Sequence, residues 1–169
     1  PLLDQISSMV NDKLNVPNHY IRKMSAAMLS IYVDAFAEAG KKNVLKHFYG
    51  VLQEYIGEEY PEGLACVLDA IREIIKNLEL NELSPPADDV ISRLVPVLKN
   101  RNEKVAYSSI MLIKVLSEKS SDLVVKKEWM RICFELLEML KAEKKDVRKA
   151  AIETFAFIAQ AIGPFDVLL

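Results

Sequence analysis

The stretch VPVLKNRNEKVAYSS, residues 95–109, contains the change of pattern on which the fold assignment rests. An apolar run with helical spacing ends at Leu98, and a polar, mostly basic turn follows at residues 99–104. The apolar spacing resumes at Val105. This pattern predicts a corner where one helix ends and the next begins, and the charge of the turn raises the question of whether it also binds a partner.

Helical spacing dominates the rest of the chain. The segments VLDAIREIIKNL (67–78) and EWMRICFELLEML (128–140) each place their apolar residues on one broad helical face. No strict apolar–polar alternation persists over four or more residues, and five glycines are few for a chain with many tight β-turns. The sequence therefore predicts an all-α fold.

The corner recurs along the chain. Aligned first apolar residues of the second helix are Ile21, Leu64, Val105 and Val147, separated by 43, 41 and 42 residues. A first amphipathic helix precedes each of them, at roughly 1–14, 42–56, 86–99 and 127–141. Two helices in a period of about 40–47 residues are typical of HEAT or armadillo repeats, and the short linkers favour HEAT.

The predicted fold class is thus an α-solenoid of about four HEAT repeats with a period of about 42 residues. We expect one array over residues 1–169, with repeats at about 1–39, 40–83, 84–122 and 123–163 and the start of a fifth helix at 164–169. Neither end has the polar outer face of a capping repeat, so an internal piece of a longer protein is expected.

Composition limits the possible partners. The 169 residues include 22 basic and 24 acidic side chains, a net charge of −2, so overall charge does not attract nucleic acid or anionic lipid. A nucleic-acid contact would have to be local. No apolar run reaches the ~18 residues of a membrane span, and no membrane partner is expected. Cys66 and Cys133 lie in apolar helical contexts and are predicted to be buried, reduced thiols, which fits the cytosol or the nucleus.

No motif for catalysis, metal binding or cofactor binding occurs in the sequence. The two histidines, His19 and His47, fall in different repeats, and the acidic residues of GEEYPE (57–62) are interpreted as a solvated turn. We therefore expect no catalytic residues, no metal site, no cofactor and no enzymatic activity.

The turns between paired helices differ in charge. The second, QEYIGEEYPEG (53–63), is acidic, whereas the third and fourth are basic. Two adjacent basic turns, about 10 Å apart by helix packing, would suit a phosphate backbone. The alternative is that their lysines are solvated and merely compensate the carboxyl end of the preceding helix. The candidates for contacts with the RNA backbone or with a partner are Lys99, Lys104, Lys144, Lys145, Arg148 and Lys149.

The same turns carry a family resemblance. The segments EYIGEEYPEGL, LSPPADDVISRLVPVLKNRNEKV, EWMRICFELLEMLKAEKKDVRKA and TFAFIAQAIGPFDVL resemble the HEAT domain of the large subunit of splicing factor 3b. The resemblance is dense from about residue 50 to 168, and from 1 to 49 mainly the repeat pattern agrees.

The resemblance implies a segment near the hinge of a long superhelix in the nucleus. In the family this part closes around branch-site RNA paired with small nuclear RNA, beside a small zinc-containing PHD-finger-like subunit. Arg101 and Val105 match residues that line the pocket for the bulged adenosine, where splicing modulators also bind. Lys99 and Lys104 match basic residues of the family. Asn102 and Tyr107 depart from the family pattern, which implies a different pocket shape.

The sequence thus predicts a non-catalytic spliceosomal scaffold that contacts branch-site RNA and other splicing factor 3b subunits. As a separate segment it is expected to be monomeric. The competing hypothesis is a protein–protein adaptor of the transport-receptor or phosphatase-scaffold type with no RNA role. The two differ in what they require of the basic turns, since only an RNA-binding scaffold needs Arg101 and Lys104 to face the same groove as Arg148 and Lys149.

Overall fold

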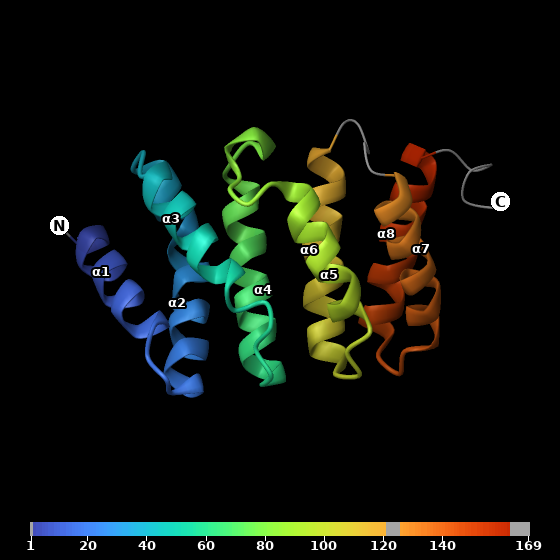
Figure 1. Ribbon diagram of the computed structural model, residues 1–169, viewed down its shortest axis with the longest axis horizontal. Helices are drawn as coiled ribbons and strands as arrows, with labels where there is room; N and C mark the ends of the chain where they lie inside the picture. The colour runs from blue at the N-terminus through green and yellow to red at the C-terminus, as the bar shows by residue number, and fades with distance from the viewer. Residues whose placement is uncertain (1, 121–125, 163–169) are drawn as a thin grey trace. The chain divides into compact units, whose positions relative to one another are not determined.

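The computed structural model describes residues 2–120 and 126–162, and within these ranges it contains only helices (Figure 1). Short turns connect the helices in successive pairs, so the predicted all-α solenoid class is confirmed. The chain divides into two compact units, residues 1–86 and 87–169, here called the N-terminal and C-terminal units. Each unit contains two of the predicted helix pairs. The single array over the whole chain stays a prediction.

The N-terminal unit consists of α1 (Leu2–Leu14), α2 (His19–Glu38), α3 (Lys42–Gln53), α4 (Pro61–Lys76) and a short 3-10 turn, Leu80–Glu82. The long helix α2 packs against α1, α3 and α4. The fully buried core of the unit includes Leu14, Leu29, Phe36, Phe48, Leu68 and Ile71.

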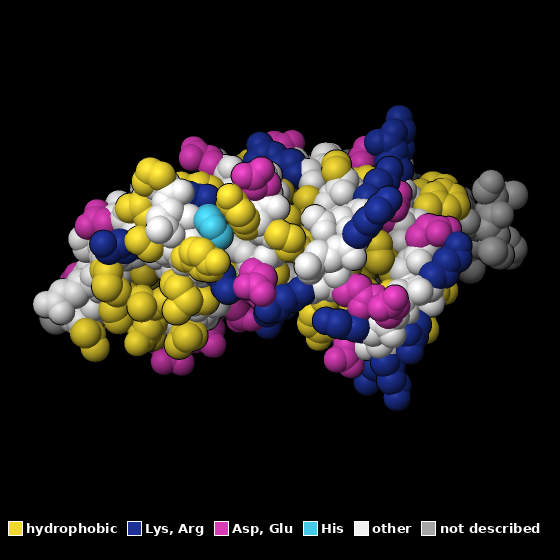
Figure 2. Space-filling view, turned by 90° about the horizontal axis from the view of Figure 1, so that it is seen from below, with side chains coloured by type: hydrophobic (Ala, Val, Ile, Leu, Met, Phe, Trp, Pro, Cys, Tyr) yellow, Lys and Arg dark blue, Asp and Glu magenta, His cyan; other side chains and the backbone are white. Residues whose placement is uncertain are grey.

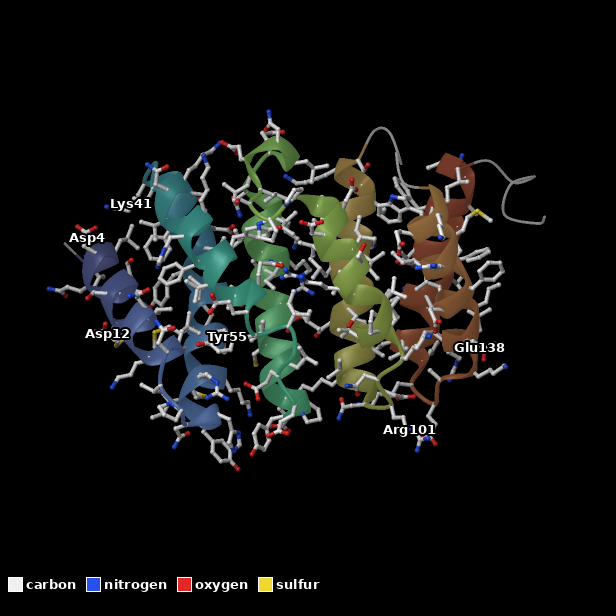
Figure 3. The ribbon with its side chains drawn as sticks, viewed as in Figure 1. Asp4, Asp12, Lys41, Tyr55, Arg101 and Glu138 are labelled. Atoms are coloured by element: carbon white, nitrogen blue, oxygen red, sulfur yellow. The ribbon has the colours of Figure 1, made fainter. Side chains whose placement is uncertain are left out.

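Ion pairs also link the helix pairs of this unit. The Nζ of Lys41 lies 2.8 Å from the Oδ1 of Asp4 and ties the start of α3 to α1 (Figure 3). This hydrogen bond lowers the pKa of Asp4 to about 2. Gly40, with φ of 73°, supplies the left-handed conformation that ends α2, as its place in the sequence predicts.

The C-terminal unit consists of α5 (Ala87–Leu98), α6 (Glu103–Lys119), α7 (Lys126–Glu138), a 3-10 turn at Met139–Lys141, and α8 (Lys145–Ile162). Helix α5 packs on α6 and α7, and α8 packs on α6 and α7. The core includes Leu94, Leu98, Ile110, Ile113, Trp129, Leu136 and Ile158. The predicted fifth helix at 164–169 lies outside the described residues.

The corner at residues 98–105 forms as predicted. Its polar residues cap the amino-terminal end of α6 by accepting hydrogen bonds from that helix's first backbone N–H groups. The Oδ1 of Asn102 accepts hydrogen bonds from the backbone N–H groups of Lys104 (3.0 Å) and Val105 (3.2 Å). Asn18 caps α2 in the same way, through the N–H groups of Tyr20 and Ile21. An asparagine cap of this kind is worth roughly 1 kcal/mol of helix stability.

Candidate nucleic-acid interface

The α5–α6 turn presents its basic side chains to solvent. Arg101 is exposed at the tip of the turn and projects away from the helices (Figure 3). No hydrogen bond or ion pair within the described residues engages its guanidinium. Lys104 is also exposed and has no ion-pair partner among these residues, whereas the Nζ of Lys99 lies 3.6 Å from a carboxylate oxygen of Glu135 on α7. Arg101 and Lys104 are therefore available to a partner.

Val105 has a different position from Arg101. Its side chain is 0% exposed and lies in the core of the C-terminal unit. The hydroxyl of Ser109, one turn later, donates a 2.7 Å hydrogen bond to the Val105 carbonyl oxygen. Of the two side chains matched to the family's pocket, Arg101 is therefore in solvent and Val105 is enclosed in the core. Their pocket role stays a prediction.

The α7–α8 turn is held together by an arginine. Nη1 of Arg148 donates to the carbonyl oxygens of Ala142 (2.6 Å) and Glu143 (2.7 Å), six and five residues earlier. The guanidinium therefore has a structural task within its own turn. The side chains of Lys144, Lys145 and Lys149 are exposed, and no ion pair within residues 126–162 or 2–120 neutralises them.

A carboxylate connects the two basic turns. Glu103, at the start of α6, accepts hydrogen bonds from the backbone N–H groups of Glu143 (2.6 Å) and Lys144 (3.0 and 3.2 Å) in the turn just before α8. Its negative charge therefore sits near the amino-terminal, positive end of the α8 dipole. Because this carboxylate binds neutral N–H groups, the nearby lysines have no ion-pair partner among the residues that the structure describes.

A shallow groove runs between α6 and α8 beside these turns. It consists of two hollows of about 160 and about 190 Å³ that share Tyr107 and Asp146 in their walls. We call it the α6–α8 groove. Its remaining lining residues are Glu103, Lys104, Met111 and Lys114 from α6, and Lys144, Val147, Lys149, Ala150 and Glu153 from the α8 side.

The groove gathers only part of the predicted basic set. Lys104 and Lys144 line the first hollow and Lys149 lines the second, whereas Arg101 and Arg148 line neither. Tyr107 was noted in the sequence only as a departure from the family pattern. Its register could have placed it here, because Tyr107 and Lys149 both lie two residues after the aligned apolar positions Val105 and Val147.

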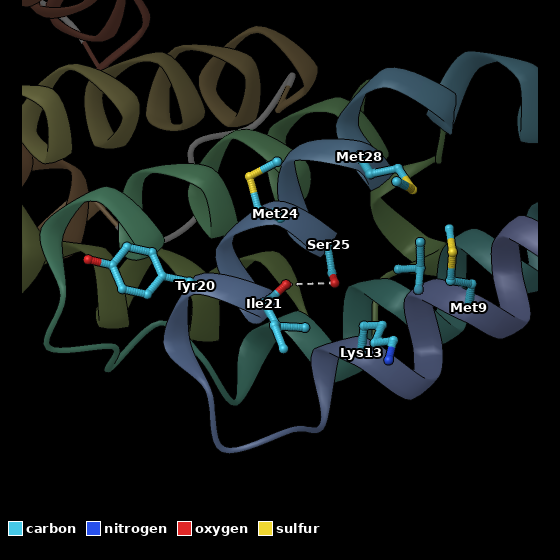
Figure 4. Close-up of a pocket in the computed structure, with 8 residues that line it drawn as sticks. Met9, Lys13, Tyr20, Ile21, Met24, Ser25 and Met28 are labelled. Carbon is cyan, nitrogen blue, oxygen red and sulfur yellow. Dashed lines mark hydrogen bonds between the residues drawn. The ribbon is translucent and has the colours of Figure 1, made fainter.

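The N-terminal unit has a groove of opposite character. A cavity of about 320 Å³ between α1 and α2 is lined almost entirely by apolar side chains, among them Met9, Met24 and Met28 (Figure 4). Figure 2 shows hydrophobic side chains gathered on this unit, and Tyr20, Met24 and Ile31 are each more than 60% exposed. Contiguous exposed apolar surface of this kind marks a site of macromolecular contact.

The other candidate reactive groups have ordinary structural roles. The ring of His19 stacks on that of Tyr60, with 3.7 Å between the ring centroids. Nε2 of His47 lies 2.8 Å from the Oδ1 of Asn11. Neither cysteine forms a disulfide within the described residues, and only Cys133 is buried. Cys66 is partly exposed on α4, so its predicted burial is wrong.

The described residues hold neither a metal-binding cluster nor a helix suited to crossing a membrane. Within them, no three His, Cys, Asp or Glu side chains gather in a way that fits a metal ion. No helix among them combines the length and the apolar character that a membrane span requires.

Comparison with known proteins first places the fold. No family model matches the chain. An engineered protein of known crystal structure superposes with a TM-score of 0.69 over 97% of this chain and 67% of its own, at 15% sequence identity. At that identity the likeness concerns the fold alone, and it agrees with an α-helical repeat protein.

Sequence comparison then identifies the relatives. The chain is 42% identical over 168 residues to the U2 snRNP component prp10 of Schizosaccharomyces pombe. It is 35% identical over 169 residues to the U2 snRNP component HSH155 of Saccharomyces cerevisiae. The chain spans 14% and 17% of the lengths of these relatives. The predicted resemblance to the large subunit of splicing factor 3b is confirmed over the whole chain.

Proposed function

We propose that this chain is a non-catalytic scaffold segment of a nuclear, spliceosomal particle that acts in pre-mRNA splicing. The observation that carries the proposal is similarity along the whole chain to two proteins named as U2 snRNP components. A helical repeat framework suits a scaffold, because each repeat offers surface to partners while resting on its neighbours.

We further propose that the C-terminal unit contacts the branch-site helix and helps to hold its adenosine in a bulged conformation. Residues 87–169 contain 14 basic and 12 acidic side chains, a net charge of +2 in a chain whose total is −2. Arg101 and Lys104 on one turn and Lys144, Lys145 and Lys149 on the next are exposed, as backbone phosphate contacts require. In this proposal Val105 contributes through the core, where its buried side chain fixes the start of α6. Lys99 and Arg148 hold the two turns in position through their contacts within the unit.

The proposed partners are other splicing factor 3b subunits, including the small PHD-finger-like zinc subunit, and branch-site pre-mRNA paired with small nuclear RNA. The apolar α1–α2 groove is the observation that favours the second candidate, a protein–protein adaptor. The two candidates make different demands on the C-terminal unit, since an adaptor does not need its unpaired lysines.

The test compares full-length protein variants in the assembled particle. Removing two phosphate contacts with Arg101→Ala and Lys104→Ala is expected to weaken branch-site association and to reduce the slope of log K against log salt by about two. Lys76→Ala with Arg131→Ala removes the same charge from exposed sites on α4 and α7 and serves as the control. Unchanged association and salt slope in the first variant would leave the adaptor as the better account.

A further inference from the structure

Tyr107 has an unusual setting for an exposed aromatic side chain. It is 37% exposed and lies in the wall shared by both hollows of the α6–α8 groove. Lys104 and Lys144 line the hollow on one side of it, and Lys149 lines the hollow on the other. An aromatic ring flanked on both sides by cations is the arrangement with which proteins bind single-stranded nucleic acid.

The bases in the groove lining outnumber the acids: Lys104, Lys114, Lys144 and Lys149 against Glu103, Asp146 and Glu153. The carboxylate of Glu103 accepts hydrogen bonds from the backbone N–H groups of Glu143 and Lys144, and forms no ion pair with a groove lysine within the described residues. Glu153 lies 3.8 Å from the Nζ of Lys114, so that pair is neutral. Only Asp146 faces the three unpaired lysines without a partner within the described residues. The groove therefore has a net positive charge around the tyrosine.

We propose that the α6–α8 groove binds a single-stranded stretch of RNA, with one base stacked on Tyr107 and the neighbouring phosphates held by Lys104, Lys144 and Lys149. This rests on the proposed RNA-binding function and adds a second contact mode to it. The branch-site contact reads the shape of a duplex, whereas stacking on a ring takes any unpaired base.

The size and the chemistry of the groove together favour RNA over an acidic peptide. Each hollow is smaller than the ~300 Å³ of a typical small-molecule pocket, so each has room for only a part of a ligand that continues past it. A nucleotide strand presents a flat ring and a phosphate in turn, which matches a ring between cations. An acidic peptide would use the lysines but would leave the ring face without a partner.

The experiment measures binding of the full chain to a fluorescein-labelled uridine decamer and to an abasic decamer of the same charge, at low salt. Tyr107→Leu is expected to weaken binding of the uridine decamer roughly 5- to 30-fold and to leave binding of the abasic decamer unchanged. Tyr107→Phe keeps the ring and is expected to bind like the wild type. Phe157→Leu, an exposed aromatic of α8 outside the groove, is the control for general effects.

The outcomes separate stacking from the other possibilities. Equal loss for both decamers in Tyr107→Leu, no loss for either, or no binding of the uridine decamer by the wild type would overturn the proposal. Stronger competition by poly-glutamate than by unlabelled uridine decamer would point to an acidic protein partner instead. If Tyr107→Leu has no effect while Arg101→Ala with Lys104→Ala still weakens branch-site association in the particle, only the stacking contact is lost and the proposed function stands.

Discussion

The two units hold their interhelical turns in a similar way but differ in net charge, the N-terminal unit being acidic and the C-terminal unit basic. In each, an arginine directly after the aligned apolar residue binds two carbonyl oxygens of its own turn. Arg22 binds those of Val16 and Pro17 in the N-terminal unit, and Arg148 binds the equivalent pair in the C-terminal unit. In each unit a carboxylate then links one turn to the next. Glu58 does so in the N-terminal unit and Glu103 in the C-terminal unit, and the two bind different kinds of partner.

In the N-terminal unit the linking carboxylate forms an ion pair with an arginine. Glu58 lies 2.8 Å from Nη2 of Arg22, and the two side chains are only 7% and 17% exposed. In the C-terminal unit, Glu103 binds backbone N–H groups instead. Residues 1–86 carry 8 basic and 12 acidic side chains, a net charge of −4 against +2 for the rest. The ion pair in one unit and the backbone hydrogen bonds in the other thus help determine which unit has unpaired basic side chains that a partner could bind.

The largest expected effect separates the two turn arginines. Arg22→Met leaves Glu58 nearly buried without its cation, whereas Arg148→Met removes only bonds to neutral carbonyls. We expect the free energy of unfolding to fall by about 2–4 kcal/mol for Arg22→Met and by about 1–2 kcal/mol for Arg148→Met. Urea unfolding followed by circular dichroism measures both.

Glu58→Gln provides the control for this comparison. If the difference comes from the stranded carboxylate, Arg22→Met should cost clearly less in the Glu58→Gln background. Equal costs for the two arginines in the wild-type background would contradict the distinction between the units.

The next effect concerns Val105 and Ile21, which occupy the same register in their repeats. Val105 is fully buried, whereas Ile21 is 38% exposed and lines the apolar groove. Val105→Ala is expected to cost roughly 1.5–3 kcal/mol of stability, and Ile21→Ala less than about 1 kcal/mol. Thermal unfolding of both variants tests this. A small cost at Val105 would mean that its side chain is less important to the core than its burial indicates.

A smaller gain is expected at Thr154. Its hydroxyl is buried and has no hydrogen-bond partner among the described residues. The same register holds Met28, Ile71 and Leu112 in the other repeats. Thr154→Val keeps the shape and removes the unsatisfied group, so the unfolding free energy should rise by about 1 kcal/mol. Ser109→Ala is the matched control, because that buried hydroxyl is hydrogen-bonded and its removal should bring no such gain. A loss in Thr154→Val would show that the hydroxyl has a partner in solution.

Sequence reasoning could find whatever repeats locally. The register of Ile21, Leu64, Val105 and Val147 predicted the helix pairs, and their observed ends lie within a few residues of the expected ones. The connections between turns were not predictable, because Arg22–Glu58 and Glu103–Lys144 join residues 36 and 41 positions apart. Which side chains meet across that separation depends on how the helices pack.

The candidate site shows the same limit. The basic residues were visible in the turns, but a turn residue in the sequence does not reveal whether it faces a groove, the core or its own backbone. Packing placed Lys104, Lys144 and Lys149 at the α6–α8 groove, and left Arg148 bound to its own turn. It also brought Tyr107 between them. The register shared by Tyr107 and Lys149 gives them equivalent places in their repeats, but that these two places meet in one groove depends on the packing of α6 against α8.

The smallest effect compares the single cysteine of each unit. Burial raises the pKa of the Cys133 thiol to about 11, so almost none of it is thiolate at pH 8, whereas Cys66 is partly exposed on α4. We expect iodoacetamide to modify Cys66 first, with Cys133 reacting only as the pH approaches 11 or as the C-terminal unit unfolds. Mass spectrometry of the two peptides over a pH series reports both rates, and Cys66→Ser isolates the Cys133 rate. Rapid modification of Cys133 at pH 8 in folded protein would mean that the C-terminal unit opens more readily than its packed core indicates.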